Sequence, residues 1–202
     1  PCSRVARWDG AAYSAMPGFP VQFEVSCTAE LNDTIYVGGR STTSGVYHDL
    51  MKWGGSTWTG ESVFPGLLPG VFDLFAHDGT LYASGRIPGV ATTRSCIKRH
   101  TSTEWECVGQ PLNGEIMSIA YFAGHLVCGG SFTGSFGSAA NDIQHVAFLD
   151  LNNTWYQMGD GLGSTVHDLL VEGGALYAAG DCVGQGLTHF GLARLSLDVI
   201  NT

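Results

Sequence analysis

Short apolar runs alternate with polar, glycine-rich turns along the whole chain, and no stretch spaces its apolar residues as a helix does. Runs such as 71–75 and 166–170 contain polar positions among apolar ones, which is typical of a strand with one buried face. Each run ends at a tight turn containing Asp, Asn or Gly, and a second apolar run follows. The pattern therefore predicts an all-β protein made of short antiparallel strands.

One segment of this pattern occurs four times at a nearly constant spacing. Each copy has a polar turn, then an apolar run, and ends in a small residue followed by glycine. The four copies are 31–39, 77–85, 122–130 and 172–180, and their aligned residues Tyr36, Tyr82, Val127 and Tyr177 are 46, 45 and 50 residues apart. A second segment recurs five times, 45 to 49 residues apart, starting at Val5, Leu50, Ile97, Val146 and Leu192. Two segments that keep one period indicate a structural repeat.

The repeat predicts a β-propeller of four-stranded antiparallel blades, because each unit of roughly 47 residues holds four short strands. We expect one domain over 1–202, with four blades as the simplest count. The units are 21–65, 66–111 and 112–162, with 163–180 completing the ring together with 1–20 and 181–202. Two alternatives remain open. The strand at 192–197 stays in the last blade while the N-terminal hairpin pairs elsewhere, or the chain is part of a longer propeller or array.

Two features of the repeat resemble the kelch family. The Gly-Gly doublets at 38–39 and 129–130 and the aromatic pairs Trp8/Tyr13 and Trp53/Trp58 match the doublet and the spaced aromatics of a kelch repeat. The doublet is altered at 84–85 and 179–180, and the aromatic pair is altered in the later copies. The repeat sequence of this chain is most similar to the kelch-like repeats of secreted and cell-surface proteins. That resemblance implies the propeller fold and leaves the activity open, because propellers host many functions.

The charge balance excludes several partners. The chain carries 18 acidic and 9 basic residues, for a net charge of −9, and no cluster of Lys and Arg. Nucleic acids and anionic membranes are bound through such clusters, so we expect neither as a partner. The longest apolar runs are only a few residues, so we also expect no membrane insertion.

The cysteines and glycosylation sequons favour an extracellular or cell-surface protein. The six cysteines contain no C-x-x-C pair, and an even number is typical of disulfides. Cys96 and Cys107 flank a predicted turn and are expected to pair, and a Cys2–Cys182 bond would clasp the ring. Sequons at Asn32 and Asn152 lie in predicted turns. The alternative is a cytosolic protein with buried free thiols.

Four carboxylates are candidates for a site in the central channel. The first strand of each blade is innermost in a propeller. One aligned row on these strands is Cys27, Asp73, Ser118 and Asp168, and the row three residues earlier contains Glu24 and Glu115. If the four carboxylates converge on the axis, they would suit a hard cation such as Ca²⁺, which takes oxygen ligands. The alternative is that they cap turns or accept hydrogen bonds from neighbouring strands.

Aromatic residues in the loops after the second strand of each blade are candidates for a binding rim. These residues are Tyr47, Phe132, Phe136 and Phe190. Exposed aromatics there would stack on a sugar or anchor a protein partner, whereas buried ones would pack their own loops.

These observations predict a non-catalytic extracellular module for binding, adhesion or surface display, acting through its rim loops on a protein or glycan ligand. A first alternative is a structural subunit that polymerises head to tail into a filament or coat. A second is a hydrolase or lyase with a carboxylate site in the channel. We expect the absence of enzymatic activity more than its presence, because the sequence carries none of the common motifs for a catalytic nucleophile, a zinc site or a phosphate-binding loop.

Overall fold

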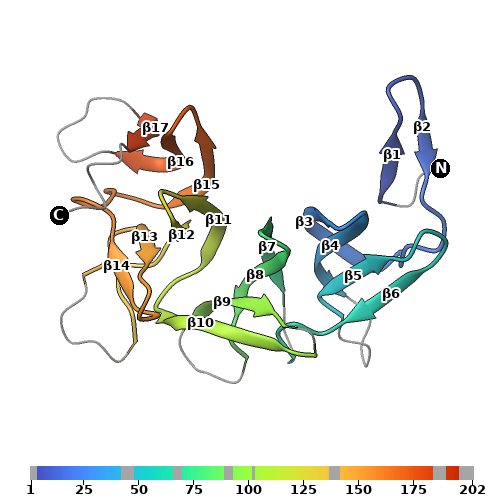
Figure 1. Cartoon of the computed structure of the whole chain (residues 1–202), viewed down its shortest axis with the longest axis horizontal. Coiled ribbons are helices and arrows are strands. Elements are labelled where there is room, and N and C mark those ends of the chain that lie inside the picture. Colours follow the sequence, from blue (N-terminus) through green and yellow to red (C-terminus); the bar gives the residue numbers. More distant parts are fainter. Residues whose placement is uncertain are drawn as a thin grey trace.

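The computed structural model describes residues 4–41, 48–65, 70–88, 93–101, 103–136, 142–183 and 190–195. Within these residues every regular element is a β-strand, and no helix is present that could span a membrane. The strands form a series of antiparallel sheets arranged along an open arc (Figure 1). The all-β prediction is therefore confirmed.

Three of the sheets are complete four-stranded blades, and a fourth has three described strands. The first blade contains β3 (Phe23–Leu31), β4 (Thr34–Ser41), β5 (Leu50–Trp53) and β6 (Trp58–Glu61). The second contains β7 (Val71–His77), β8 (Thr80–Arg86), β9 (Ser95–His100) and β10 (Trp105–Leu112). The third contains β11 (Ile116–Phe122), β12 (His125–Gly130), β13 (Val146–Leu149) and β14 (Trp155–Gln157). The fourth contains β15 (Val166–Glu172), β16 (Ala175–Val183) and β17 (Phe190–Leu195).

The N-terminal hairpin lies at one end of the arc and the fourth blade at the other (Figure 1). β1 (Ala6–Trp8) and β2 (Tyr13–Ala15) form a separate two-stranded sheet. β17 pairs with β16, with Leu192 opposite Ala179, and so takes the third place in the fourth blade. The number of blades and the closure of the ring stay predictions.

Tight turns explain why the first two strands of each blade form a hairpin. In the first two blades the turn residues are Asn32-Asp33 and Asp78-Gly79, and all four have positive φ, between 50° and 71°. Two consecutive residues with positive φ form the turn whose twist matches that of a β-hairpin, and Asn, Asp and Gly accept this conformation most readily. These residues therefore fix the register of each hairpin.

A β-bulge occurs at the same place in all four first strands. The register shifts between Val25 and Cys27 in β3, and likewise immediately before Asp73, Ser118 and Asp168. A bulge inserts one extra residue, bends the strand and re-aims the next side chain. We name the four residues that follow the bulges the inner row; its members are Cys27, Asp73, Ser118 and Asp168.

Successive blades pack through aliphatic residues that face a small residue in the preceding blade. Val71 and Leu74 lie in one buried cluster with Leu50 of the first blade. A Cβ atom added at Gly38 would lie 2.7 Å from Cγ1 of Val71 and 2.6 Å from Sγ of Cys27. Glycine is therefore required at this position by the close approach of the next blade, as the doublet in the sequence suggested.

We expect Gly38→Ala to destabilise the protein by about 1–3 kcal/mol, because the added methyl group overlaps stiff neighbours at the boundary between two blades. Gly54→Ala is the matched control, since the nearest atom that its methyl group would meet is the Thr57 carbonyl oxygen at 3.6 Å. Urea unfolding of the two variants measures the difference. Equal stabilities would contradict this packing.

Candidate functional site

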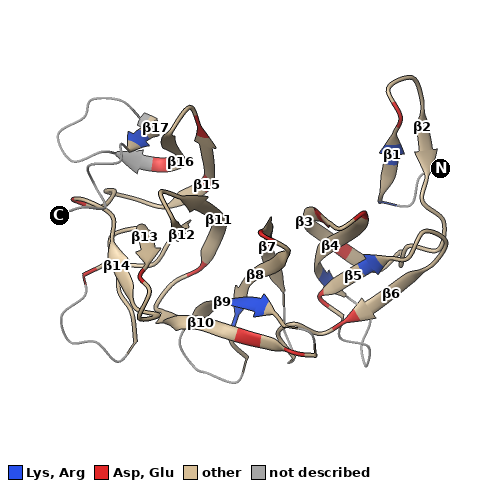
Figure 2. Ribbon diagram, viewed as in Figure 1, with Lys and Arg blue, Asp and Glu red and all other residues tan. Residues whose placement is uncertain are grey.

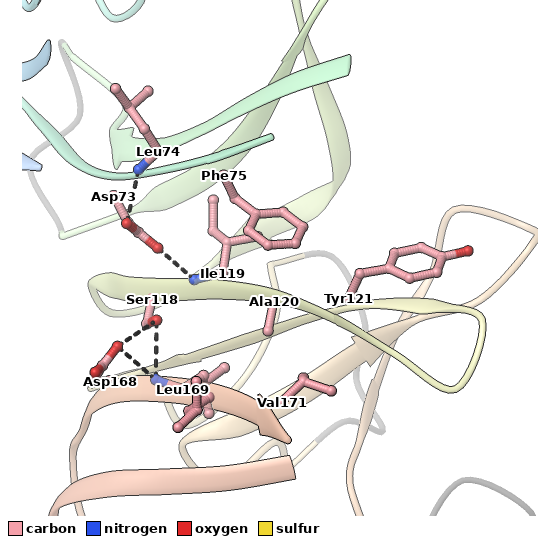
Figure 3. A pocket seen from close by; sticks show the side chains of 11 residues that line it. Asp73, Leu74, Phe75, Ser118, Ile119, Ala120, Tyr121, Asp168, Leu169 and Val171 are labelled. Carbon is pink, nitrogen blue, oxygen red and sulfur yellow. Dashed lines mark hydrogen bonds between the residues drawn. The ribbon is translucent and has the colours of Figure 1, made fainter. Parts of the chain in front are cut away.

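An open cleft of about 350 Å³ lies where the first strands β7, β11 and β15 meet. Three inner-row residues, Asp73, Ser118 and Asp168, line it together with Phe75 and Tyr121 (Figure 3). The bulges bring these polar side chains to the edge where neighbouring blades touch. The cleft therefore combines fixed oxygen atoms with apolar and aromatic surface.

Hydrogen bonds to the backbone hold the inner row in place. The N–H of Leu74 donates to Oδ1 of Asp73 at 2.8 Å, and the N–H of Ile119 in the next blade donates to Oδ2 at 2.7 Å. Asp73 thus joins the second blade to the third, as the dashed lines in Figure 3 show.

Ser118 makes the corresponding link from the third blade to the fourth. Its hydroxyl oxygen accepts a hydrogen bond from the N–H of Leu169 at 3.1 Å and donates one to Oδ1 of Asp168 at 3.3 Å. The same N–H of Leu169 also donates to Oδ1 of Asp168 at 2.9 Å. Ser118, Asp73 and Asp168 therefore all accept hydrogen bonds from strand backbone. This is the alternative to a cation site that the sequence analysis left open.

Burial raises the pKa of Asp73 to about 6, and the negative charge of Asp168 acts in the same direction. The N–H groups of Ile119 and Leu74 oppose this shift, because they stabilise the charged form. Asp73 is thus a carboxyl group that gains a proton under mildly acidic conditions while lining an open cleft.

Three stacked rings form a ledge, and two of them, Phe75 and Tyr121, line the cleft together with the carboxylates. The His77 ring stacks on Tyr121 with a centroid distance of 3.8 Å and on Phe75 with a centroid distance of 6.0 Å. The Tyr121 hydroxyl donates to the Gly124 carbonyl oxygen at 2.9 Å, which fixes the ring. All three rings are partly exposed. We name Phe75, His77 and Tyr121 the aromatic ledge.

The structure does not gather the four predicted carboxylates into one group. Glu24 pairs with Arg40 at 2.6 Å on exposed parts of β3 and β4, and Glu115 pairs with Arg86 of the preceding blade. In the described part of the chain no three Asp, Glu, His or Cys side chains come together as metal ligands. Two carboxylates fall short of the roughly six to eight oxygens that Ca²⁺ takes. A calcium ion in the channel stays a prediction, and the described residues do not supply a complete set of ligands for it.

The rim prediction is wrong for Phe132. This ring is fully buried in the cluster that contains Ile116, Ile143 and Trp155, because residues 131–136 form backbone hydrogen bonds with 111–115. Phe136 is half-buried beneath the Arg94 guanidinium, which lies 3.7 Å from the ring centroid. Tyr47 and the side chain of Phe190 lie outside the described residues.

Cys96 and Cys107 are free thiols in this structure and not the predicted disulfide. Cys107 lies opposite Lys98, so the two cysteines are diagonal rather than directly opposed. The sulfurs nevertheless interact, and this hydrogen bond lowers the pKa of Cys107 to about 7 and raises that of Cys96. Cys2 and the side chain of Cys182 lie outside the described residues.

The remaining sequence predictions fall on exposed turns. Asn32 and Asn152 both lie there, where glycans would have room, although glycosylation itself stays a prediction. Lys and Arg residues are spread over β1, β4, β5, β8, β9 and β17 rather than gathered in one place (Figure 2).

The aromatic ledge was not among the predicted site residues. Phe75 and His77 are separated by one residue on β7 and therefore share a face, which was a usable signal. Tyr121 comes from the neighbouring blade, so only the packing of β11 on β7 reveals that the three rings meet.

No family model matches this chain, and no curated protein matches it. Several solved structures do. The computationally designed Ika8 protein matches with a TM-score of 0.50 at 13% identity, over 82% of this chain and 45% of that one. The GH43 endo-arabinanase from Bacillus licheniformis matches with a TM-score of 0.50 at 14% identity, over 88% of this chain and 72% of that one. The chain thus spans less than half the length of the designed protein.

These similarities define the class of protein. Together with the four-stranded antiparallel sheets, they show that the fold is a β-propeller. At identities this low they show the fold alone, so any function has to be argued from the cleft.

We expect Asp73→Asn to remove a pH-dependent contribution to stability. The folded-state pKa of about 6 lies above the usual value of about 3.9, so the folded protein binds the extra proton and this contribution is lost as pH rises from 4 to 6. Relative to the variant, the wild type should lose on the order of 2 kcal/mol over that range. Urea unfolding at each pH measures it. A constant difference between the two proteins would contradict the raised pKa.

Proposed function

We propose that this chain is a non-catalytic extracellular binding module with kelch-like propeller repeats, and that its ligand is a glycan bound in the cleft. The aromatic ledge beside Asp73 and Asp168 carries this proposal. Ring faces cover the apolar face of a sugar, and fixed carboxylate oxygens accept hydrogen bonds from its hydroxyl groups. The cleft volume of about 350 Å³ also falls within the usual range of small-ligand sites.

The arrangement of charge favours a neutral or cationic glycan. Asp73 and Asp168 both line the cleft, and the chain as a whole carries a net charge of −9. An anionic sugar would have to approach these carboxylates against electrostatic repulsion. Exposed sequons at Asn32 and Asn152 support an extracellular or cell-surface location.

A hydrolase is the second candidate, and one observation favours it. Two carboxylates line the same cleft, and burial raises the pKa of one of them to about 6. Glycoside hydrolases use such a pair, with the higher pKa on the general acid. Against this, both oxygens of Asp73 already accept backbone hydrogen bonds, and the one from Ile119 joins two blades. The same geometry at Ser118, which cannot act as a carboxylate, supports a structural role for these bonds.

We expect Tyr121→Ala and Phe75→Ala each to weaken the binding of a neutral oligosaccharide at least tenfold, because both rings line the cleft and either change removes part of the ledge. Arabinan oligosaccharides are a suitable first probe, since one solved structure with this fold is an endo-arabinanase. Tyr156→Ala is the matched control: this ring stacks on Phe148 and is 45% exposed, but does not line the cleft. Isothermal titration calorimetry measures the affinity, and thermal unfolding confirms that each variant is folded.

The same samples decide between the two candidates. A binding module returns the oligosaccharide intact after prolonged incubation. A hydrolase would release shorter sugars, and this release would be lost in both Asp73→Asn and Asp168→Asn. That result would contradict the binding module and support the hydrolase. Binding that is unchanged in both ledge variants, or reduced equally by the control, would contradict the proposed site.

A further inference from the structure

A repeated joint connects each described blade to the next. In every case an inner-row residue accepts a hydrogen bond from the N–H of a residue on the following first strand. Cys27 accepts it from Leu74, Asp73 from Ile119, and Ser118 from Leu169. The three donors occupy equivalent places, one residue after the inner row.

Each joint also has an apolar part. The following blade contributes an aliphatic residue just before its bulge, namely Val71, Ile116 or Val166, and all three are fully buried. Val71 faces Gly38 and Val166 faces Gly129, where an added Cβ would lie 2.5 Å from Cγ1 of Val166. The third strand of the preceding blade contributes a fully buried aliphatic residue to the same contact. In each blade this residue pairs with the small residue of the second strand; the three residues are Leu50, Ile97 and Val146.

The fourth blade carries the same receiving surface with no blade seated on it among the described residues. Its small residue is Ala179, opposite Asp168, and its third-strand residue Leu192 is 61% exposed instead of buried. Leu170 beside it is also 61% exposed. These residues line a hollow of about 350 Å³ together with Tyr177. Both hydrogen bonds that Asp168 accepts from described residues go to Oδ1, whereas in Asp73 the oxygen Oδ2 links to the next blade.

The first blade carries the matching inserting surface. Val25 is equivalent to Val71, Ile116 and Val166 by its pairing with the strand-closing glycine, yet it is 40% exposed. Thr28 is equivalent to Leu74 by its place one residue after Cys27, and it is exposed as well. Its backbone N–H therefore lies where the other three first strands donate to the preceding blade.

We propose that the hollow of the fourth blade binds the first blade of a second copy of this chain, head to tail. Val25 of one copy enters the hollow beside Ala179 of the other, and the N–H of Thr28 donates to Oδ2 of Asp168. A second copy is the occupant because the two surfaces complement each other by the same rule that joins the internal blades. In the open arc the first and fourth blades also lie apart, so the two surfaces do not meet within one chain in this arrangement (Figure 1).

Two variants test the two halves of the joint separately. Val25→Asp places a charge on the inserting surface, and Leu192→Asp places one at the rim of the hollow. Both positions are exposed, so neither change disturbs a core. Leu151→Asp is the matched control, since this leucine is 95% exposed in a turn away from both surfaces. Thermal unfolding verifies that all three variants fold like the wild type.

Sedimentation velocity from about 1 µM to about 1 mM measures the assembly. We expect the wild type and the Leu151→Asp control to associate as concentration rises, and each joint variant to raise the dissociation constant at least tenfold. An equimolar mixture of Val25→Asp and Leu192→Asp should form one-to-one dimers, because each variant keeps the surface that the other has lost. A wild type that stays monomeric throughout would overturn the proposal. Association that survives both variants, or that the control abolishes equally, would overturn it too.

Discussion

The hydrogen bond from a first strand to the inner row of the preceding blade is the constraint on which the rest of this structure depends. It is the one polar link repeated at each of the three described boundaries, through Cys27, Asp73 and Ser118. The bulge before each of these residues makes the link possible, because it turns the side chain toward the edge of the strand. The aliphatic contacts beside it exclude water from the same boundary.

This joint also accounts for the character of the cleft. The polar atoms at its base are there because they join blades, and the aromatic ledge stands above them because Phe75 and His77 continue along β7. A binding site built in this way is rigid before any ligand arrives, which lowers the entropic cost of binding. The same hydrogen bonds constrain acid–base chemistry, because they stabilise the charged form of Asp73 and so oppose its protonation.

The repeat made the fold predictable from the sequence, whereas the site depended on contacts between blades. Alternating runs, Asn/Asp/Gly turns and the Gly38-Gly39 doublet each have a local physical cause, so the strands and hairpins could be located in advance. The inner row was also placed on the first strands. Its role was left open because the sequence does not show whether a carboxylate meets a cation or a backbone N–H. Glu24 and Glu115 were predicted to face the channel, and the sequence does not show that each has an arginine partner on another strand. Phe132 was misassigned because loop aromatics give no sign of which way they fold.

The most direct test of the account is an NMR titration of the Ile119 amide with pH, with Asp73→Asn as reference. If Asp73 joins the second and third blades while facing the cleft, the amide resonance shifts with a midpoint near pH 6, and the shift is absent in the variant. A saturating oligosaccharide ligand should move that midpoint, because it occupies the surface beside the carboxyl group. An Ile119 amide that does not respond to the ionisation of Asp73 would contradict the joint and, with it, the site built upon it.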